Sequence, residues 1–179
     1  MWRFVFLVLL LSVFSAQAAE KSRWSTEYDD HFRKYSKRYF GPNFDWRWFK
    51  AQAITESYLN PTAISSAGAQ GIMQILPTTF ADIRAENPHY TDIYTPKWNI
   101  AAGIFYDRYL FRHKRLSNLA EEQRLMATFA AYNAGLGGVI NALNRTPPPA
   151  DRWHKISPQA PRETQLYVKR IQVYKRDLY

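Results

Sequence analysis

Glu56 is the residue of this chain with the clearest potential for acid–base chemistry. Phe49, Ala53 and Glu56 are spaced i, i+4, i+7, so Glu56 shares a helical face with apolar residues. A carboxyl group on such a face is partly desolvated, which disfavours its charged form and raises its pKa. We therefore expect Glu56 to hold a proton near neutral pH, as a general acid must. The plainer alternative is a surface glutamate near a helix end.

A glycine-containing segment, Gly68-Ala69-Gln70-Gly71-Ile72-Met73-Gln74-Ile75, follows Glu56 in the chain. Its two glycines let the backbone take tight conformations and come close to a ligand. The amide of Gln74 and the main-chain groups suit the acetamido and hydroxyl groups of an amino sugar, and Met73 offers a polarizable apolar surface. A turn that leads into the core is the alternative interpretation.

A tyrosine–asparagine pair, Tyr132-Asn133, lies in the segment Ala130-Ala131-Tyr132-Asn133-Ala134-Gly135. The pair stands at the end of a predicted helix, which Gly135 stops. The hydroxyl of Tyr132 could bond to Glu56 and orient it, and Asn133 could bond to the chain or to a glycan. A buried tyrosine beside a helix-terminal asparagine is the alternative.

The first elements that must position these residues lie between residues 20 and 77. Tyr28, Phe32, Tyr35 and Tyr39 are spaced i, i+4, i+7, i+11, which predicts an N-terminal helix within residues 20–44 that packs onto the domain. Asp45 is a plausible N-cap for a helix through about Leu59, and Pro61 cannot continue that helix. Residues 60–77 read as an irregular loop.

The later elements are also predicted to be helical. The expected features are a short helix capped by Thr78 or Thr79, a helix over Asn99 to Leu110, a capping box at Asn118-Leu119-Ala120-Glu121, a loop over Arg145 to Pro161 and a helix over Glu163 to about Arg176. No internal repeat occurs, and no stretch shows the sustained alternation of a large sheet. The fold class is therefore mainly α, in one domain.

Composition favours an exported protein. The 179 residues are 46% hydrophobic, enough for one compact domain. Residues 1–19 read as a signal peptide with a charged start, an apolar run from Phe4 to Phe14 and an Ala-Gln-Ala cleavage signal. That run is shorter than the roughly 20 residues that span a bilayer. We expect a periplasmic or secreted protein with no transmembrane segment in its mature form.

The residue types that are missing exclude several chemistries. With no cysteine, disulfides, a cysteine nucleophile and thiolate metal sites are ruled out. The four histidines are scattered, and no nucleotide-binding or nucleophile-elbow motif occurs, so we expect no metal and no cofactor. The formal charge is +9, or +8 once the leader and its Arg3 are removed. A basic exported protein favours an acidic partner, such as peptidoglycan carboxylates, anionic lipid or nucleic acid, although surface solvation explains the charge equally well.

The order of these motifs resembles the lysozyme-like domain of the soluble lytic transglycosylases. The resemblance runs from about Asp45 to about Ile171, and includes Glu163-Thr164 with Tyr167-Val168. It implies a single lysozyme-like domain over 45–179, α+β with minimal sheet, after a helical extension over 20–44. It also implies cleavage of the β-1,4 bond between N-acetylmuramic acid and N-acetylglucosamine in peptidoglycan, without water, to leave 1,6-anhydromuramic ends.

The same resemblance implies a role for each matching residue. Glu56 protonates the glycosidic oxygen and then, as carboxylate, takes the proton of the C6 hydroxyl that attacks C1. The acetamido group of the substrate supports the intermediate, so no second catalytic carboxylate is needed. The groove and support positions are Ser57, Gly71, Ile72, Met73, Gln74, Tyr132 and Asn133. Glu163 and Tyr167 border the site, with Glu163 expected in a structural ion pair, while Asp82, Asp92 and Asp107 match no catalytic motif.

Three other functions compete with this interpretation. One is a hydrolytic muramidase of the same fold, and a second is an inactive peptidoglycan-binding assembly factor. A nucleic-acid binder is the third, and the leader and the dispersed positive charges oppose it. Because the chain has no separate wall-binding module, recruitment by an envelope-spanning assembly complex is a further hypothesis.

Overall fold

The computed structural model describes residues 23–179, and their regular structure is almost wholly helical. The predicted signal peptide lies outside the described residues. In chain order the elements are α1 (Asp29–Phe40), α2 (Arg47–Ser57), α3 (Pro77–Glu86), α4 (Pro96–Phe111), α5 (Glu121–Ala134), α6 (Leu136–Arg145), α7 (Trp153–Ile156), the 3₁₀ turn η1 (Ser157–Gln159) and α8 (Arg162–Arg176). The prediction of a mainly α fold is confirmed. No helix within residues 23–179 has the length and apolar character needed to cross a membrane.

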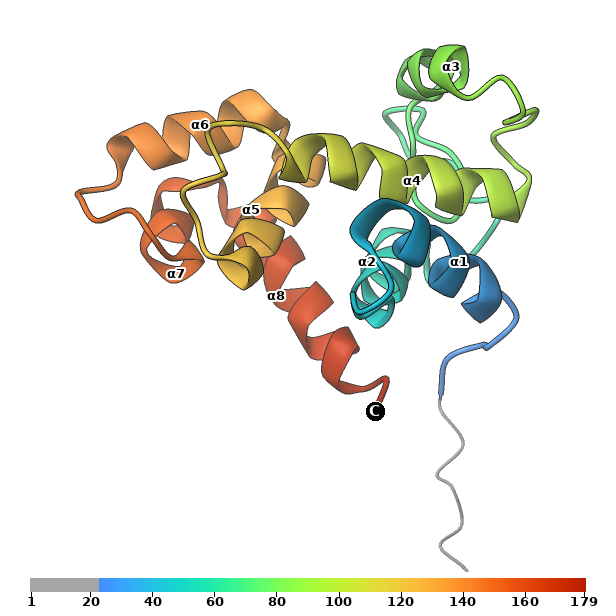
Figure 1. Ribbon diagram of the computed structural model, residues 1–179, viewed down its shortest axis with the longest axis horizontal. Coiled ribbons are helices and arrows are strands. Elements are labelled where there is room, and N and C mark those ends of the chain that lie inside the picture. Colours follow the sequence, from blue (N-terminus) through green and yellow to red (C-terminus); the bar gives the residue numbers. More distant parts are fainter. Residues whose placement is uncertain (1–22) are drawn as a thin grey trace, which may run out of the picture.

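Helix α4 crosses the molecule and connects two groups of helices (Figure 1). At one end α1 and α3 pack against it, and at the other end α5 does. Helix α8 returns from the α5 group and packs along α2. This return brings the C-terminal helix against the helix that carries Glu56.

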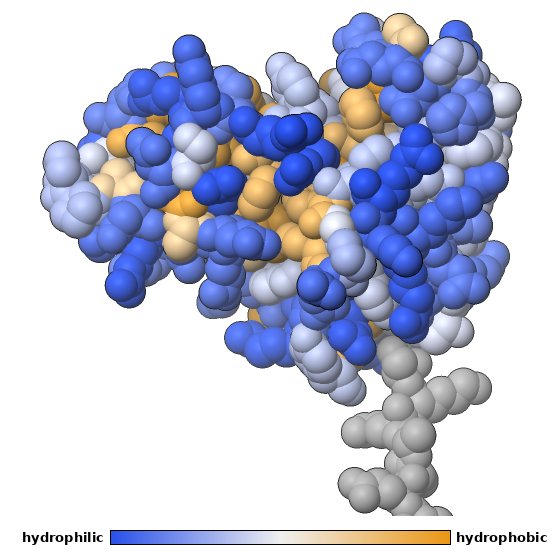
Figure 2. All heavy atoms as spheres, viewed as in Figure 1, coloured by the Kyte–Doolittle hydropathy of each residue, from blue (hydrophilic) through white to orange (hydrophobic). Residues whose placement is uncertain are grey.

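One hydrophobic core runs through both groups of helices. Phe32 and Tyr35 of α1, Ile104 of α4 and Phe129 of α5 are among its buried members. In Figure 2 hydrophobic residues also gather in the middle of the visible face, between the α5 side and the α1 side, with hydrophilic residues around them. The predicted aromatic stripe of the N-terminal helix is confirmed as a core-facing stripe, since its other two members, Tyr28 and Tyr39, pack partly buried against the core.

Helix α2, which carries Glu56, begins at Arg47 close to the predicted start, but its N-cap is Trp46 rather than the predicted Asp45. The Oδ1 atom of Asp45 accepts a hydrogen bond from the Arg47 backbone N–H at 3.1 Å. The helix ends at Ser57 rather than at Leu59, because Tyr58 and Leu59 have positive φ angles of 56° and 66°. Residues other than glycine seldom adopt this conformation, so the sequence carries no local sign of this stop.

Three of the predicted helix starts are wrong. Helices α3 and α4 begin at Pro77 and Pro96, each with proline in the first turn, rather than at a threonine cap or at Asn99. Proline fits the first turn because its fixed φ is helical and no N–H is needed there. The capping box does not form, since the residue before α5 is Ala120 and no side chain caps this helix. Instead, the Arg124 side chain bonds to the carbonyls of Ser117 and Leu119.

Two helices were not predicted. Helix α6 starts directly after Gly135, whose φ of 75° turns the chain without ending the helical region. Helix α7 and the η1 turn lie within the segment predicted as a loop. The segment between α2 and α3 is irregular as predicted, with two isolated antiparallel bridges, Ile64 with Gln70 and Gln70 with Ile75. These two bridges correspond to the minimal sheet that the family resemblance implied.

A buried ion pair fastens α1 to α2. Lys50 Nζ lies 2.6 Å from Asp29 Oδ1, and the two side chains are 2% and 15% exposed. Asp29 also stands at the N-terminus of α1, where a negative charge is favourable. Removing either partner would leave a largely buried charge unpaired.

We expect Lys50→Ala to lower the free energy of unfolding by about 3 kcal/mol, because it leaves the Asp29 carboxylate without its partner. Urea denaturation followed by circular dichroism measures this change. The matched control is Lys37→Ala on the exposed side of α1, for which we expect less than about 0.5 kcal/mol. Equal effects of the two variants would contradict the role given to the ion pair.

Candidate active site

The carboxyl group of Glu56 is held between α2 and α8. Glu56 lies in the last turn of α2 and is half-buried. The hydroxyl of Tyr167, on α8, donates a hydrogen bond to Glu56 Oε1 at 2.5 Å. Tyr167 is itself buried, so this bond fixes the orientation of the carboxyl group.

Burial sets the protonation of Glu56. It raises the pKa of this carboxyl to about 7, although the Tyr167 hydrogen bond and the charge of Arg170 both lower it. A carboxyl with a pKa near 7 is protonated in half the molecules at neutral pH, and can therefore both give and take a proton there. The expectation drawn from its apolar helical face agrees with this environment.

Ser57 joins α2 to the glycine-containing segment. Its hydroxyl donates to the backbone carbonyl of Ile72 at 2.8 Å and lies 3.4 Å from the Ala53 carbonyl. Ile72 itself is fully buried. Ser57 thus supports the backbone of the glycine-containing segment rather than facing a ligand.

Asn99, at the start of α4, holds the segment from the other side. Its Oδ1 accepts the Met73 backbone N–H at 2.7 Å, and its Nδ2 donates to the carbonyls of Gln70 and Ile93. Gly71 has a φ of 75°, and a Cβ atom there would lie 2.4 Å from Asn99 Nδ2. Glycine at position 71 is therefore required by both its conformation and its contact with Asn99.

Gln74 and Met73 are engaged within the protein. Gln74 Nε2 donates to the carbonyls of Ala63 and Gly71 at 3.2 and 2.9 Å. These two bonds hold parts of the loop between α2 and α3 together. Met73 is fully buried, and a Cβ atom at Gly103 would lie 2.8 Å from its side chain. These contacts give both residues a supporting role.

The expectation that Tyr132 bonds to Glu56 is wrong. The Tyr132 hydroxyl donates to the Met73 carbonyl at 2.7 Å, while the bond to Glu56 comes from Tyr167. Both tyrosines lie near the carboxyl group: burial raises the pKa of each of them, and a negative charge on Glu56 raises it further. The sequence analysis placed both tyrosines near the site and did not show which one reaches Glu56.

Asn133 and Glu163 lie at the edge of the site. Asn133 Oδ1 accepts a hydrogen bond from Thr164 at 2.8 Å, which ties the end of α5 to α8. Glu163 is exposed in the first turn of α8. The ion pair expected for it does not form with any residue in the described part of the chain.

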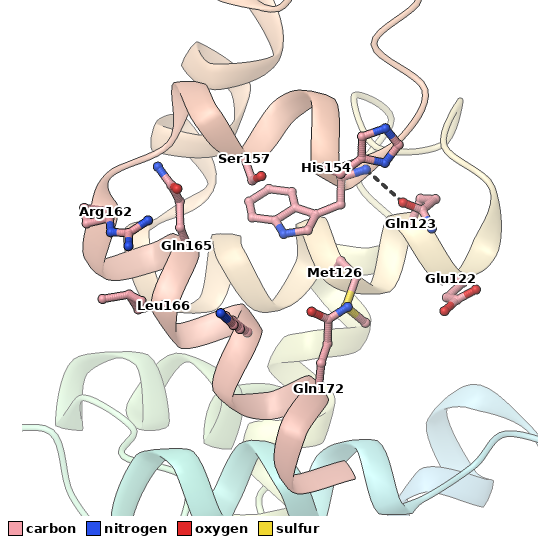
Figure 3. Close-up of a pocket in the computed structure, with 11 residues that line it drawn as sticks. Glu122, Gln123, Met126, His154, Ser157, Arg162, Gln165, Leu166 and Gln172 are labelled. Atoms are coloured by element: carbon pink, nitrogen blue, oxygen red, sulfur yellow. Dashed lines mark hydrogen bonds between the residues drawn. The ribbon is translucent and has the colours of Figure 1, made fainter. Parts of the chain in front are cut away.

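A separate pocket of about 490 Å³ borders α8 (Figure 3). It is lined from α5, α7 and α8, and the backbone N–H of Trp153 donates to Gln123 Oε1 at its edge. Glu56 and Tyr167 do not line it. Over residues 23–179, no three histidine, cysteine or acidic side chains gather as a metal site would require.

Sequence reasoning missed two residues near the site. Asn99 was predicted only as the first residue of a helix, and nothing in the sequence around it indicated its hydrogen bonds to Gln70 and Met73. Asp107 was set aside because it matches no catalytic motif, yet it is fully buried, and a negative charge on it would raise the pKa of both Tyr132 and Tyr167. No local pattern distinguishes such an aspartate from a solvated one.

Comparison with known proteins places this chain in a family. A family model described as the transglycosylase SLT domain matches residues 31–154. The membrane-bound lytic murein transglycosylase F of Haemophilus influenzae strain PittGG is 34% identical over 115 residues, which cover 64% of this chain and 22% of that protein. Its namesake in Vibrio cholerae strain ATCC 39541 is 30% identical over 134 residues, or 73% of this chain and 23% of that protein. The chain thus spans less than a quarter of the length of these relatives.

Solved structures agree with the sequence match. The 70 kDa soluble lytic transglycosylase of Escherichia coli has a TM-score of 0.71 and 28% identity, covering 87% of this chain and 24% of that one. A complex of the 70 kDa soluble lytic transglycosylase with bulgecin A has a TM-score of 0.68 and 29% identity, and covers the same shares of the two chains. The predicted lysozyme-like fold is therefore confirmed, and the chain belongs to the transglycosylase SLT domain family.

Proposed function

We propose that this chain is a peptidoglycan lytic transglycosylase that cleaves the β-1,4 bond between N-acetylmuramic acid and N-acetylglucosamine. The observation that carries the proposal is Glu56, a half-buried carboxyl group with a pKa of about 7 that Tyr167 orients. The chain also matches the transglycosylase SLT domain over residues 31–154, and the relatives reported above are named lytic murein transglycosylases. The two solved structures reported above bear the words soluble lytic transglycosylase in their names.

In the proposed reaction Glu56 first donates its proton to the glycosidic oxygen, and the bond from that oxygen to C1 breaks. The acetamido group of the muramic residue supports the positive charge at C1. The C6 hydroxyl then attacks C1 while its proton passes to the Glu56 carboxylate. This step restores the acid and forms the 1,6-anhydro ring without consuming water. One carboxyl group is enough, as in other substrate-assisted glycan cleavage.

We also propose that the protein acts in the cell envelope, after export by its leader, on peptidoglycan strands. Recruitment by an envelope-spanning assembly complex extends this proposal. Affinity capture from envelope extracts tests the recruitment: an assembly component retained by the wild-type protein supports it, and capture of peptidoglycan alone contradicts it.

The products of digestion test the reaction. We expect purified sacculi to release muropeptides with 1,6-anhydromuramic ends, because the C6 hydroxyl replaces water as the nucleophile. Mass spectrometry distinguishes these ends from reducing ends, which are heavier by one water. Reducing ends would identify a hydrolytic muramidase, and no release would identify a binding protein.

The variant Glu56→Gln tests the assignment of the acid. We expect glycan cleavage to fall by about 10³-fold or more, since the amide cannot donate the proton that the leaving oxygen needs. Turbidity loss of sacculi measures this rate. Circular dichroism and sedimentation with sacculi should show unchanged folding and binding. An active Glu56→Gln enzyme would refute the assignment.

The pH dependence of cleavage should report the protonation of Glu56. Because the acid must be protonated to start the reaction, we expect kcat/KM to fall above about pH 7. Tyr167→Phe removes a hydrogen bond that lowers this pKa, so its basic limb should move to higher pH, and kcat should drop by about 10- to 100-fold as orientation is lost. Tyr109→Phe, an exposed tyrosine on α4, is the matched control and should leave the limb in place. If the basic limb of the Tyr167→Phe profile stays where the wild type has it, the Tyr167 hydrogen bond does not lower the pKa of Glu56.

A further inference from the structure

Two fully buried polar side chains lie next to the helix face that carries Glu56. Gln52 precedes Glu56 by one turn of α2, and Asp107 reaches Gln52 from α4. Gln52 Nε2 donates to Asp107 Oδ1 at 3.3 Å. The two remaining oxygens, Gln52 Oε1 and Asp107 Oδ2, are buried and have no hydrogen-bond partner.

An ionised Asp107 fits these surroundings badly. Both unpartnered oxygens would then be acceptors with no donor. A buried carboxylate needs a cation or several donors, and in the described part of the chain Asp107 forms no ion pair. A proton on Oδ2 removes the conflict, because Asp107 can then donate to Gln52 Oε1. The acid and the amide would form a closed pair with two hydrogen bonds and no unsatisfied atom.

We propose that Asp107 is held by Gln52 as a neutral carboxylic acid and acts as a positioning residue for Glu56. The pair fixes the buried face of α2 one turn before the catalytic group. It also keeps a second negative charge away from Glu56 during the part of the cycle in which Glu56 is a carboxylate. The role in the cycle rests on the proposed function, whereas the protonation state of Asp107 does not.

The groups around Asp107 support a neutral acid. They come from four helices: Glu56 from α2, Tyr132 from α5, Tyr167 from α8, and its neighbour Tyr106 on α4. All four are acids. Burial raises the pKa of Asp107 well above its usual range, a charged Glu56 raises it further, and the Gln52 bond opposes them.

Unfolding measured against pH tests the protonation state with no reference to activity. Above about pH 4 an unfolded chain has released the Asp107 proton, while the proposed native state still holds it. Stability of the wild type should therefore fall with rising pH relative to Asp107→Asn, which can pair with Gln52 amide to amide. We expect the ratio of the two unfolding constants to change about tenfold for each pH unit between about pH 5 and about pH 7.

The control is Asp82→Asn, which changes an exposed aspartate on α3. The ratio of its unfolding constant to that of the wild type should stay constant with pH. A constant ratio for Asp107→Asn as well would overturn the proposal.

A second measurement is the infrared difference between wild type and Asp107→Asn at a pH where Glu56 is ionised. We expect the carbonyl band of a protonated carboxylic acid in the wild type, and carboxylate bands alone would overturn the proposal.

The positioning role is tested by the pH profile of cleavage. Gln52→Glu lets two carboxyl groups share one proton, which leaves a negative charge beside Glu56 and should move the basic limb of kcat/KM up by about one pH unit. Asp107→Asn keeps the pair neutral and should leave the limb where the wild type has it. If Gln52→Glu does not move the limb, the pair has no positioning role. An inactive wild type would instead refute the proposed function, and the unfolding and infrared results would still decide the state of Asp107.

Discussion

The hydrogen bond from Tyr167 to Glu56 is the interaction on which this structure depends for its chemistry. It joins residues far apart in the chain and bridges α2 and α8 at 2.5 Å. A half-buried carboxyl group without a donor would be costly and free to turn. With the tyrosine in place the carboxyl keeps one orientation, and its pKa stays near 7 because burial outweighs the bond and the charge of Arg170.

The segment between α2 and α3 has almost no regular structure of its own and is held in place from outside. Ser57 binds it from α2, Asn99 from α4 and Tyr132 from α5, each through a backbone group of residues 70–73. An irregular loop must satisfy its backbone polar groups one by one, since no helix or sheet does so. This need explains why several residues that resemble substrate-binding positions bond to the protein itself.

The interior behind Glu56 is polar as well as buried. Gln52 and Asp107 occupy positions where helix packing would accept apolar side chains. Their contact links α2 with α4, so the central helix is connected by a polar pair to the helix that carries Glu56. Any change of charge there would act on Glu56 and on both neighbouring tyrosines.

By itself, the sequence determined the helical class, the burial of the α1 stripe and the inward face that carries Glu56. These features follow from spacing along one helix, which periodicity reports directly. Only the tertiary structure decided that Tyr167 rather than Tyr132 reaches Glu56, that Asn99 clamps Gly71 and Met73, and that Asp107 meets Gln52. Periodicity gives the face on which a residue lies but not its partner on another helix, because that partner depends on how the helices are packed against each other.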